Sequence, residues 1–504
     1  MERAPDEATD TTASRPVLAA GALWSFLGQG VPLLVALVTI PVLVAEYGTE
    51  RFGVLALVWA AVGYFTLFDL GLSRALTQWV AGRTDRAEGS SLGSTIWTAL
   101  LLMGLLGLLG GVALAAATPW LVETVLTMPQ ELVGEARTSF LLVAASVPFL
   151  TFSQALRGIL EAHLKFAIVN AVRIPLGSLT MLGPLFLLLF SDSLVPAVVV
   201  VVLSRVADGA LYLWFCLGVQ PELRERIRIQ IPAVVPLMRF GGWMTVSNIV
   251  GPMMLFLDRF LIGSLVSVAA TAFYATPYDI VTRLLIVPAA ISAVLFPAFA
   301  AAAKSSDPRR TLRLFVSGLK YAFAALFPFV FLIVVFATEL LDVWIGEEFA
   351  RESATVLRIL AIGVLVNCLA QIAFALIQGL GRADITAKFH LAEAPFYLVL
   401  LWWSVSRFGI EGAAAAWTIR VTADAVLLAI AAARVADCPA APLVRAAAIL
   451  AFGTTLAVLV ASVDSGSIRI VLSGAVVGLC VVLTWMFALS VEDRRFLSFR
   501  QALR

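Results

Sequence analysis

Charged side chains that could bind an anion or carry a proton lie inside long apolar stretches of this chain. The run MLFLDRFLIG (254–263) places Asp258 directly before Arg259. Each charge near the centre of a bilayer costs about 2.5–3.5 kcal/mol on insertion scales. Adjacent residues point about 100° apart on a helix, so both need partners on another helix. Asp279 and Arg283 follow in the next apolar run. An antiparallel packing predicts Arg259 near Asp279 and Asp258 near Arg283, either as a buried structural network or as a charged wall of a cleft.

Three further charges are expected deep in apolar segments. Asp69 and Arg74 lie in LFDLGLSRAL, and Glu393 lies in HLAEAPFYL. A deep carboxylate without an obvious cation on its helix face is a candidate proton carrier, because burial favours the protonated form. Burial in a polar contact between helices is the alternative for Glu393.

Two pairs of opposite charges share a helix face. Arg205 and Asp208 are three residues apart, and Arg420 and Asp424 are four apart, which are spacings that bring side chains together on a helix. An intrahelical ion pair that helps a charge to insert explains each pair as well as a functional site does. Like Glu393, the carboxylates Asp208 and Asp424 are candidate residues for ion coupling.

The composition is that of a polytopic membrane protein. Hydrophobic residues make up 61% of the 504 residues and charged residues only 13%, whereas soluble domains average about a quarter charged residues. The net charge of +2 and the absence of a basic tract argue against nucleic-acid binding. Four scattered cysteines and two isolated histidines predict no disulfide framework and no metal site. No cofactor is expected.

Apolar runs of about 20 residues, long enough to span a bilayer, recur along the chain. The sequence predicts an all-α protein with about fourteen transmembrane helices. They are placed at 17–45, 52–80, 92–117, 137–160, 166–190, 194–219, 237–264, 270–300, 314–338, 354–380, 384–406, 412–434, 445–462 and 468–490.

The basic residues predict the orientation of these helices. Every second predicted loop is basic, as in GRTDRAEG (82–89) and KSSDPRRTLR (304–313), and so is the tail EDRRFLSFRQALR. The positive-inside rule then places both termini in the cytoplasm. An even number of spans agrees with termini on the same side.

An internal repeat predicts two lobes of six helices each. Landmarks recur in order at an offset of about 220 residues: Trp24 and Trp243, Trp120 and Trp344, Gly158 and Gly379, and SRVADGALYL (204–213) and IRVTADAVLL (419–428). Copies with an even number of helices share one topology and are expected to face each other about an axis along the membrane normal. This is transporter architecture.

The predicted organisation therefore has six parts. They are a disordered cytoplasmic N-terminus (1–16), an N-lobe with helices one to six (17–219), a basic cytoplasmic linker (220–236), a C-lobe with helices seven to twelve (237–434), two additional helices (435–490) and a basic cytoplasmic tail (491–504).

Several segments resemble the polysaccharide transporter family, the Wzx-type flippases of the MOP exporter superfamily. RFGVLALVWAAVGYFTLFDLGLSRALTQ (51–78) resembles the second helix of that family. GGWMTVSNIVGPMMLFLDRFLIG (241–263) with YATPYDIVTRLLIVP (274–288) resembles its helices seven and eight. LIQGLGRADITAKFH (376–390) resembles the linker between its helices ten and eleven.

The resemblance implies two six-helix lobes around a cationic cavity, in a bacterial cytoplasmic membrane. The implied activity is movement of undecaprenyl-diphosphate-linked oligosaccharide to the outer leaflet by alternating access, for O-antigen, lipopolysaccharide or exopolysaccharide synthesis. Implied partners are this substrate, membrane lipids, a polysaccharide polymerase and export proteins. The implied substrate-binding residues are Asp69, Arg74, Asp258, Arg259, Asp279 and Arg283. Arginine suits a diphosphate because its planar guanidinium binds in a bidentate manner.

Two other classes of protein compete with this interpretation. A MATE-type ion-coupled exporter of small molecules shares the fold, but twelve helices and an acidic, aromatic cavity are usual there. A membrane-embedded glycosyltransferase, ligase or polymerase is disfavoured, because no predicted external loop is long and no DxD motif follows the first helix. The sequence therefore predicts a transporter and not an enzyme.

Overall fold

The computed structural model of the protein describes residues 15–67, 92–163, 165–224, 253–304, 308–436 and 441–483, with the single positions 227 and 229. Within these ranges the chain is helical apart from short turns, and no strand is present. Eleven of the described helices are long and apolar enough to cross a membrane by length and composition. Each of the fourteen predicted spans overlaps a described helix. The predicted all-α fold class is confirmed.

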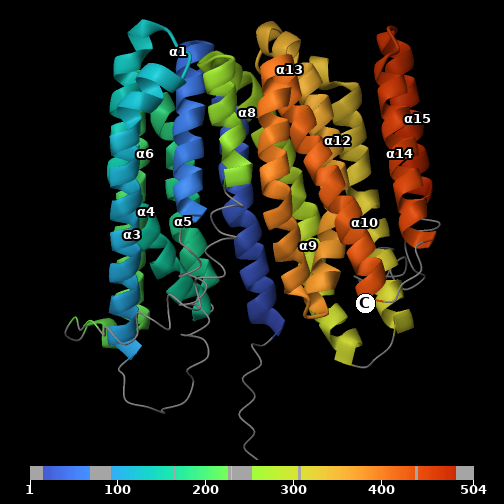
Figure 1. The fold of residues 1–504 in the computed structure, drawn as a ribbon, viewed down its shortest axis with the longest axis horizontal. Coiled ribbons are helices and arrows are strands. Elements are labelled where there is room, and N and C mark those ends of the chain that lie inside the picture. The colour runs from blue at the N-terminus through green and yellow to red at the C-terminus, as the bar shows by residue number, and fades with distance from the viewer. Residues whose placement is uncertain are drawn as a thin grey trace, which may run out of the picture. The chain divides into compact units, whose positions relative to one another are not determined.

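Two helical runs are each too long for a single span. α1 (Arg15–Leu67) and α13 (Ala383–Val435) have 53 residues apiece, about 80 Å at 1.5 Å per residue, whereas a hydrocarbon core is about 30 Å thick. The backbone leaves the helical region at Gly48 (φ 73°, ψ 165°) and at Gly409 (φ 57°, ψ −135°). Glycine adopts a positive φ without a steric penalty. Each run is therefore two segments that meet at a glycine, as the predicted pairs of spans require (Figure 1).

The described helices belong to two compact units. The first unit takes its residues from 1–46, 61–122 and 133–249. Besides the first part of α1 it contains α3 (Leu92–Trp120), α4 (Gln130–Ala162), α5 (Phe166–Leu187), α6 (Leu194–Val219) and the short turn Pro221–Arg224. Its core joins Ile96 of α3, Ile159 of α4, Val169 of α5 and Cys216 of α6.

The second unit takes its residues from 47–60, 123–132 and 250–504. It contains the helical residues 253–265, α8 (Val268–Thr282), the turn Arg283–Leu285, α9 (Ile286–Lys304), α10 (Pro308–Val335), α11 (Ala337–Trp344), α12 (Glu347–Gly379), α13, α14 (Ala441–Ala461) and α15 (Gly466–Leu483). α12 is the centre of this unit, because α8, α9, α10, α11 and α13 all pack against it. α14 and α15 pack on α10 (Figure 1).

Two segments of the predicted N-lobe pack with the second unit. Thr127 donates its backbone N–H to Gly263 O at 2.9 Å and accepts one from Val268 at 3.0 Å. Gly53 approaches Val268 so closely that a Cβ at this glycine would lie 2.0 Å from the carbonyl oxygen. Sequence position alone does not reveal this exchange of segments.

The order of helices agrees with the predicted duplication. Leu92 and Pro308, which begin α3 and α10, are 216 residues apart, and Gln130 and Glu347, which begin α4 and α12, are 217 apart. Trp120 ends α3 and Trp344 ends α11, so the two tryptophans of this repeated pair both lie at helix ends.

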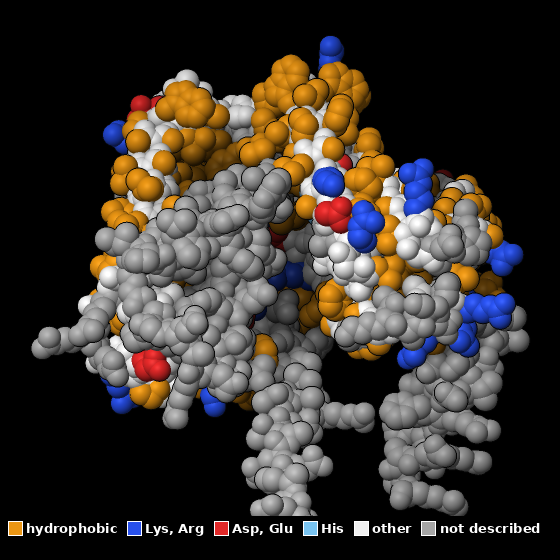
Figure 2. All heavy atoms as spheres, turned by 60° about the horizontal axis from the view of Figure 1, so that its bottom comes forward, with side chains coloured by type: hydrophobic (Ala, Val, Ile, Leu, Met, Phe, Trp, Pro, Cys, Tyr) orange, Lys and Arg blue, Asp and Glu red, His pale blue; other side chains and the backbone are white. Residues whose placement is uncertain are grey.

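Among the side chains that Figure 2 colours by type, the apolar ones are the most extensive. Val343 is 89% exposed and Phe190 83% exposed, and many other large apolar side chains are exposed with them. Contiguous apolar surface of this kind is costly in water and suits contact with lipid. Three described cysteines, Cys216, Cys368 and Cys480, are free thiols.

Candidate functional site

The first charged cluster lies where helical residues 253–265 turn back into α8. Ser267 caps α8, because its side chain accepts the backbone N–H of Ala270 at 3.0 Å. The short link reverses the chain, so the two helices run side by side in opposite directions. Asp258 is completely buried and Arg259 is only 3% exposed.

Asp258 is held by two donors. The Tyr274 hydroxyl donates to one carboxylate oxygen at 2.7 Å, and the Arg259 backbone N–H donates to the other at 2.8 Å. The predicted pairing of Asp258 with Arg283 is wrong. α8 ends at Thr282, and the tighter turn that begins at Arg283 leaves this side chain exposed, without an ion pair among the described residues.

Arg259 is bound on several sides. Its guanidinium forms an ion pair with Asp279 and donates to Leu255 O at 3.2 Å. It also lies over the Tyr278 ring, 4.9 Å from the ring centroid. The predicted pairing of Arg259 with Asp279 is confirmed. The Asp279 side chain is 46% exposed, so the ion pair is buried at its arginine end and open at its carboxylate end.

The sequence interpretation missed the tyrosines of this cluster. Tyr274 and Tyr278 stack on each other with ring centroids 5.7 Å apart, and both are buried. Their spacing of four residues puts them on one face of α8, and Asp279 directly follows the second. An i,i+4 tyrosine pair inside an otherwise apolar span is the signal that could have found them.

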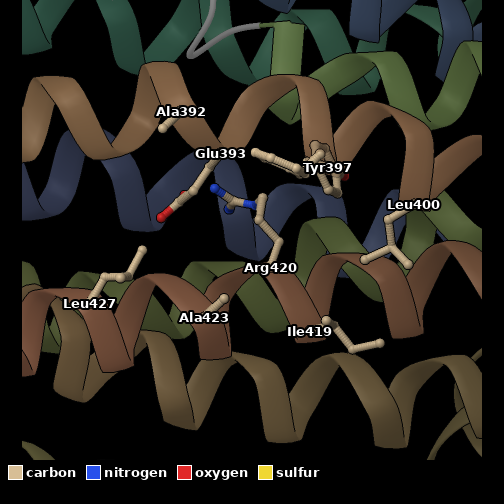
Figure 3. A pocket seen from close by; sticks show the side chains of 9 residues that line it. Ala392, Glu393, Tyr397, Leu400, Ile419, Arg420, Ala423 and Leu427 are labelled. Carbon is tan, nitrogen blue, oxygen red and sulfur yellow. The ribbon is translucent and has the colours of Figure 1, made fainter.

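The second charged cluster lies between the two halves of α13. Glu393 is sixteen residues before the break at Gly409 and Asp424 is fifteen after it, so a hairpin bent at this glycine brings them to the same level. Figure 3 shows Glu393 and Arg420 reaching into the space between the two halves. A cavity of about 340 Å³ opens here, lined by Ala392, Glu393, Phe396, Tyr397, Leu400, Ile419, Arg420, Ala423 and Leu427.

The two predicted intrahelical pairs behave differently. Arg205 and Asp208 form an ion pair at 3.0 Å, and Arg205 also donates to the Thr180 hydroxyl at 2.9 Å. Arg420 and Asp424 form no ion pair in the described part of the chain. The Arg420 guanidinium instead lies over the Tyr397 ring, 5.3 Å from its centroid.

Three of the predicted site residues, Asp69, Arg74 and Asp208, belong to neither charged cluster as described. Asp69 and Arg74 lie outside the described residues. Asp208 belongs to the first unit, whereas Glu393 and Asp424 belong to the second. Among the described side chains no group of three His, Cys, Asp or Glu residues is arranged to hold a metal ion.

Sequence comparison relates this chain to proteins of polysaccharide synthesis. Residues 18–303 match the family described as "Polysaccharide biosynthesis protein". A Shigella flexneri protein named "Putative O-antigen transporter" is 31% identical over 408 residues, which cover 81% of this chain and 95% of the relative.

Structure comparison relates the fold to known transporters. The lipid II flippase MurJ in an inward closed conformation superposes with a TM-score of 0.72 at 11% identity, over 93% of this chain and 99% of MurJ. An inward-facing multidrug resistance MATE family transporter of the MOP superfamily superposes with a TM-score of 0.67 at 16% identity, over 81% of this chain and 98% of the transporter. At these identities the likeness concerns the fold alone.

Proposed function

Because this chain belongs to the polysaccharide biosynthesis protein family, we propose that it moves a lipid-linked oligosaccharide across the membrane. The substrate class is an undecaprenyl-diphosphate-linked oligosaccharide, carried from the inner to the outer leaflet of a bacterial cytoplasmic membrane by alternating access. Both termini lie in the cytoplasm in this proposal. A polymerase and export proteins would receive the product.

The observation that carries this proposal is the 31% identity to the Shigella flexneri relative over 95% of its length. The fold does not separate the candidate functions, because a flippase and a drug exporter superpose on this chain about equally well. A MATE-type exporter of small molecules remains the alternative. The Shigella flexneri relative is named as a transporter, which supports a transporter and not an enzyme.

The described cations favour Arg283 as the first contact for a diphosphate. Its side chain is exposed where α8 gives way to the turn before α9. Arg259 is already neutralised by Asp279, so it reaches substrate only when that ion pair opens. Asp258 and Asp279 then act as residues that position Arg259. Asp69 and Arg74 complete the proposed set from the second predicted helix.

A reconstituted system tests the proposal directly. The purified protein would be placed in liposomes that contain a fluorescent undecaprenyl-diphosphate oligosaccharide, and the fraction reaching the opposite leaflet would be measured with a membrane-impermeant lectin. We expect protein-dependent translocation. A hydrogen bond to a charged group contributes about 1.5–3 kcal/mol, so Arg283→Ala should slow translocation at least about tenfold.

Two controls make this test specific. Arg351→Ala removes an arginine whose side chain is 70% exposed near the start of α12, and should leave the rate unchanged. A cationic dye would be offered to the same liposomes. Transport of the dye without movement of the lipid would contradict the flippase proposal and favour the drug-exporter alternative.

A further inference from the structure

The cavity within α13 contains a carboxylate that is buried and has no partner. Glu393 is 8% exposed, and neither of its carboxylate oxygens has a hydrogen-bond partner. Asp424 is 9% exposed, and its Oδ1 also lacks one. Burying a polar group without a hydrogen bond is costly, and most buried polar groups in proteins are paired. These oxygens therefore point to a missing ligand.

The charges around the cavity do not balance. Glu393 interacts electrostatically with Asp424 and Arg420, which are its charged neighbours. Two carboxylates and one guanidinium leave one negative charge uncompensated. In a low-dielectric interior an isolated ion is far costlier than a neutral group, and a buried group usually neutralises instead. The cavity therefore lacks one positive charge.

The other groups near this carboxylate pair do not supply that charge. On α13 itself, His390 interacts electrostatically with Asp424 but also with Arg420, whose positive charge opposes a second one on the imidazole. The Tyr397 hydroxyl is buried without a hydrogen-bond partner. From α8, Tyr278 interacts electrostatically with Arg420. Asp258 and Arg259 act on Tyr397 from helical residues 253–265, but Arg259 is already paired with Asp279.

We propose that Glu393 and Asp424 together bind one proton, held in a hydrogen bond between the two carboxyl groups. One carboxyl group gains an O–H bond and donates it to an oxygen of the other, which stays ionised and is balanced by Arg420. This single proton gives one oxygen of each carboxyl group a hydrogen bond and removes the uncompensated charge.

The lining of the cavity favours a proton over a metal cation. The polar residues that line it are Glu393, Tyr397 and Arg420, so a single carboxyl group faces a guanidinium that repels cations. Hard metal cations take about six or more oxygen ligands. The remaining lining residues are apolar, such as Phe396, Leu400 and Leu427.

The proton site adjoins the Arg259 cluster. Tyr397 interacts electrostatically with Asp258, Arg259 and Tyr278 as well as with Arg420. Tyr278 also contacts Trp417 edge to face, with ring centroids 5.6 Å apart. The buried tyrosines of α8 and α13 thus connect the proton site to the cluster with which substrate is proposed to interact. The link between the proton site and transport rests on the proposed function, whereas the proton site itself does not.

Infrared difference spectroscopy on the full-length protein in phosphatidylcholine–phosphatidylglycerol liposomes tests the site without any transport measurement. Spectra recorded in potassium buffer while the pH is lowered from alkaline to neutral values, at which exposed carboxylates stay ionised, should show the C=O stretching band of a protonated carboxyl group. Glu393→Gln and Asp424→Asn should each abolish this band, because Arg420 balances the one carboxylate that remains. Arg420→Gln should keep the band, because both carboxylates then lack a cation.

A matched control is Glu411→Gln, which removes an exposed carboxylate from the same helix and should leave the band unchanged. Size-exclusion elution at the wild-type position would establish that each variant is folded. Persistence of the band in both Glu393→Gln and Asp424→Asn would overturn the proposal. Its disappearance when sodium replaces potassium at constant pH would assign the pair to a metal ion and would equally overturn it.

Discussion

At the residue scale, Arg259 and Asp258 are kept in an apolar helix because each has partners. Tyr274 and a backbone N–H satisfy Asp258, while Asp279 and the face of Tyr278 receive Arg259. Of the two pairs that the sequence predicts here, only Arg259 with Asp279 is present. The Asp279 side chain is 46% exposed, so this ion pair is open on its carboxylate side.

Arg259→Gln should destabilise the protein, because it leaves Asp258 as a fully buried charge without a nearby cation. Leaving a buried charge uncompensated by removing its cation costs about 3–5 kcal/mol. Adding Asp258→Asn should recover a large part of that loss, since no buried charge then remains uncompensated. Thermal unfolding in detergent, followed by fluorescence-detected size-exclusion chromatography, measures both variants. Equal melting temperatures for the single and double variants would contradict this account.

At the element scale, the break at Gly409 determines which residues of α13 meet. Gly409 has φ 57° and ψ −135°, a combination that residues with a Cβ rarely adopt. The break turns one long run into two segments and brings Glu393 level with Asp424. A shift of this break by even a few residues would separate the two carboxyl groups by a turn of helix.

Gly409→Ala should therefore lower stability by about 1–3 kcal/mol, the cost of holding a residue with a Cβ in such a conformation. No atom lies within 4 Å of the position that the new Cβ would take, so any loss comes from backbone strain and not from a clash. Gly474→Ala is the matched control, because Gly474 lies inside α15 with equally open surroundings. Equal melting temperatures of the two variants, measured as for Arg259→Gln, would refute the argument.

At the scale of the whole molecule, the chain is a multi-pass membrane protein built from repeated helices. α3 and α10 begin 216 residues apart, and α4 and α12 begin 217 apart. The repeat in the sequence is thus also a repeat in the positions of the helices. The two compact units do not follow a single cut in the sequence, because 47–60 and 123–132 pack with the C-terminal half. Each unit therefore takes segments from more than one stretch of the chain.

The orientation of the helices in the membrane can be tested with topology reporters. A reporter fused after Arg228, in the predicted basic linker, should be active only in its cytoplasmic form. One inserted near Glu347, at the start of α12, should be active only in its external form. The physical reason is the retention of Lys and Arg on the cytoplasmic side. Reversed activity at either position would discard the proposed orientation.

The sequence by itself determined the features that depend on local pattern. Apolar runs gave the helices and their approximate bounds, because a bilayer requires long apolar helices whose backbone is satisfied internally. The antiparallel arrangement of neighbouring helices was enough to predict the pairing of Arg259 with Asp279. The repeat was visible because landmarks recur in order.

Tertiary structure decided which side chains meet across helices. Arg283 does not pair with Asp258, because the Asp258 carboxylate lies level with Tyr274, which precedes Arg283 by more than two turns of α8. The Arg420 guanidinium lies over the Tyr397 ring and forms no ion pair with Asp424, its neighbour on the same helix face. Glu393 and Asp424 come close enough to interact electrostatically because α13 breaks at Gly409. A periodic pattern fixes the face of a helix on which a side chain lies, but the partner across that face depends on where the backbone turns.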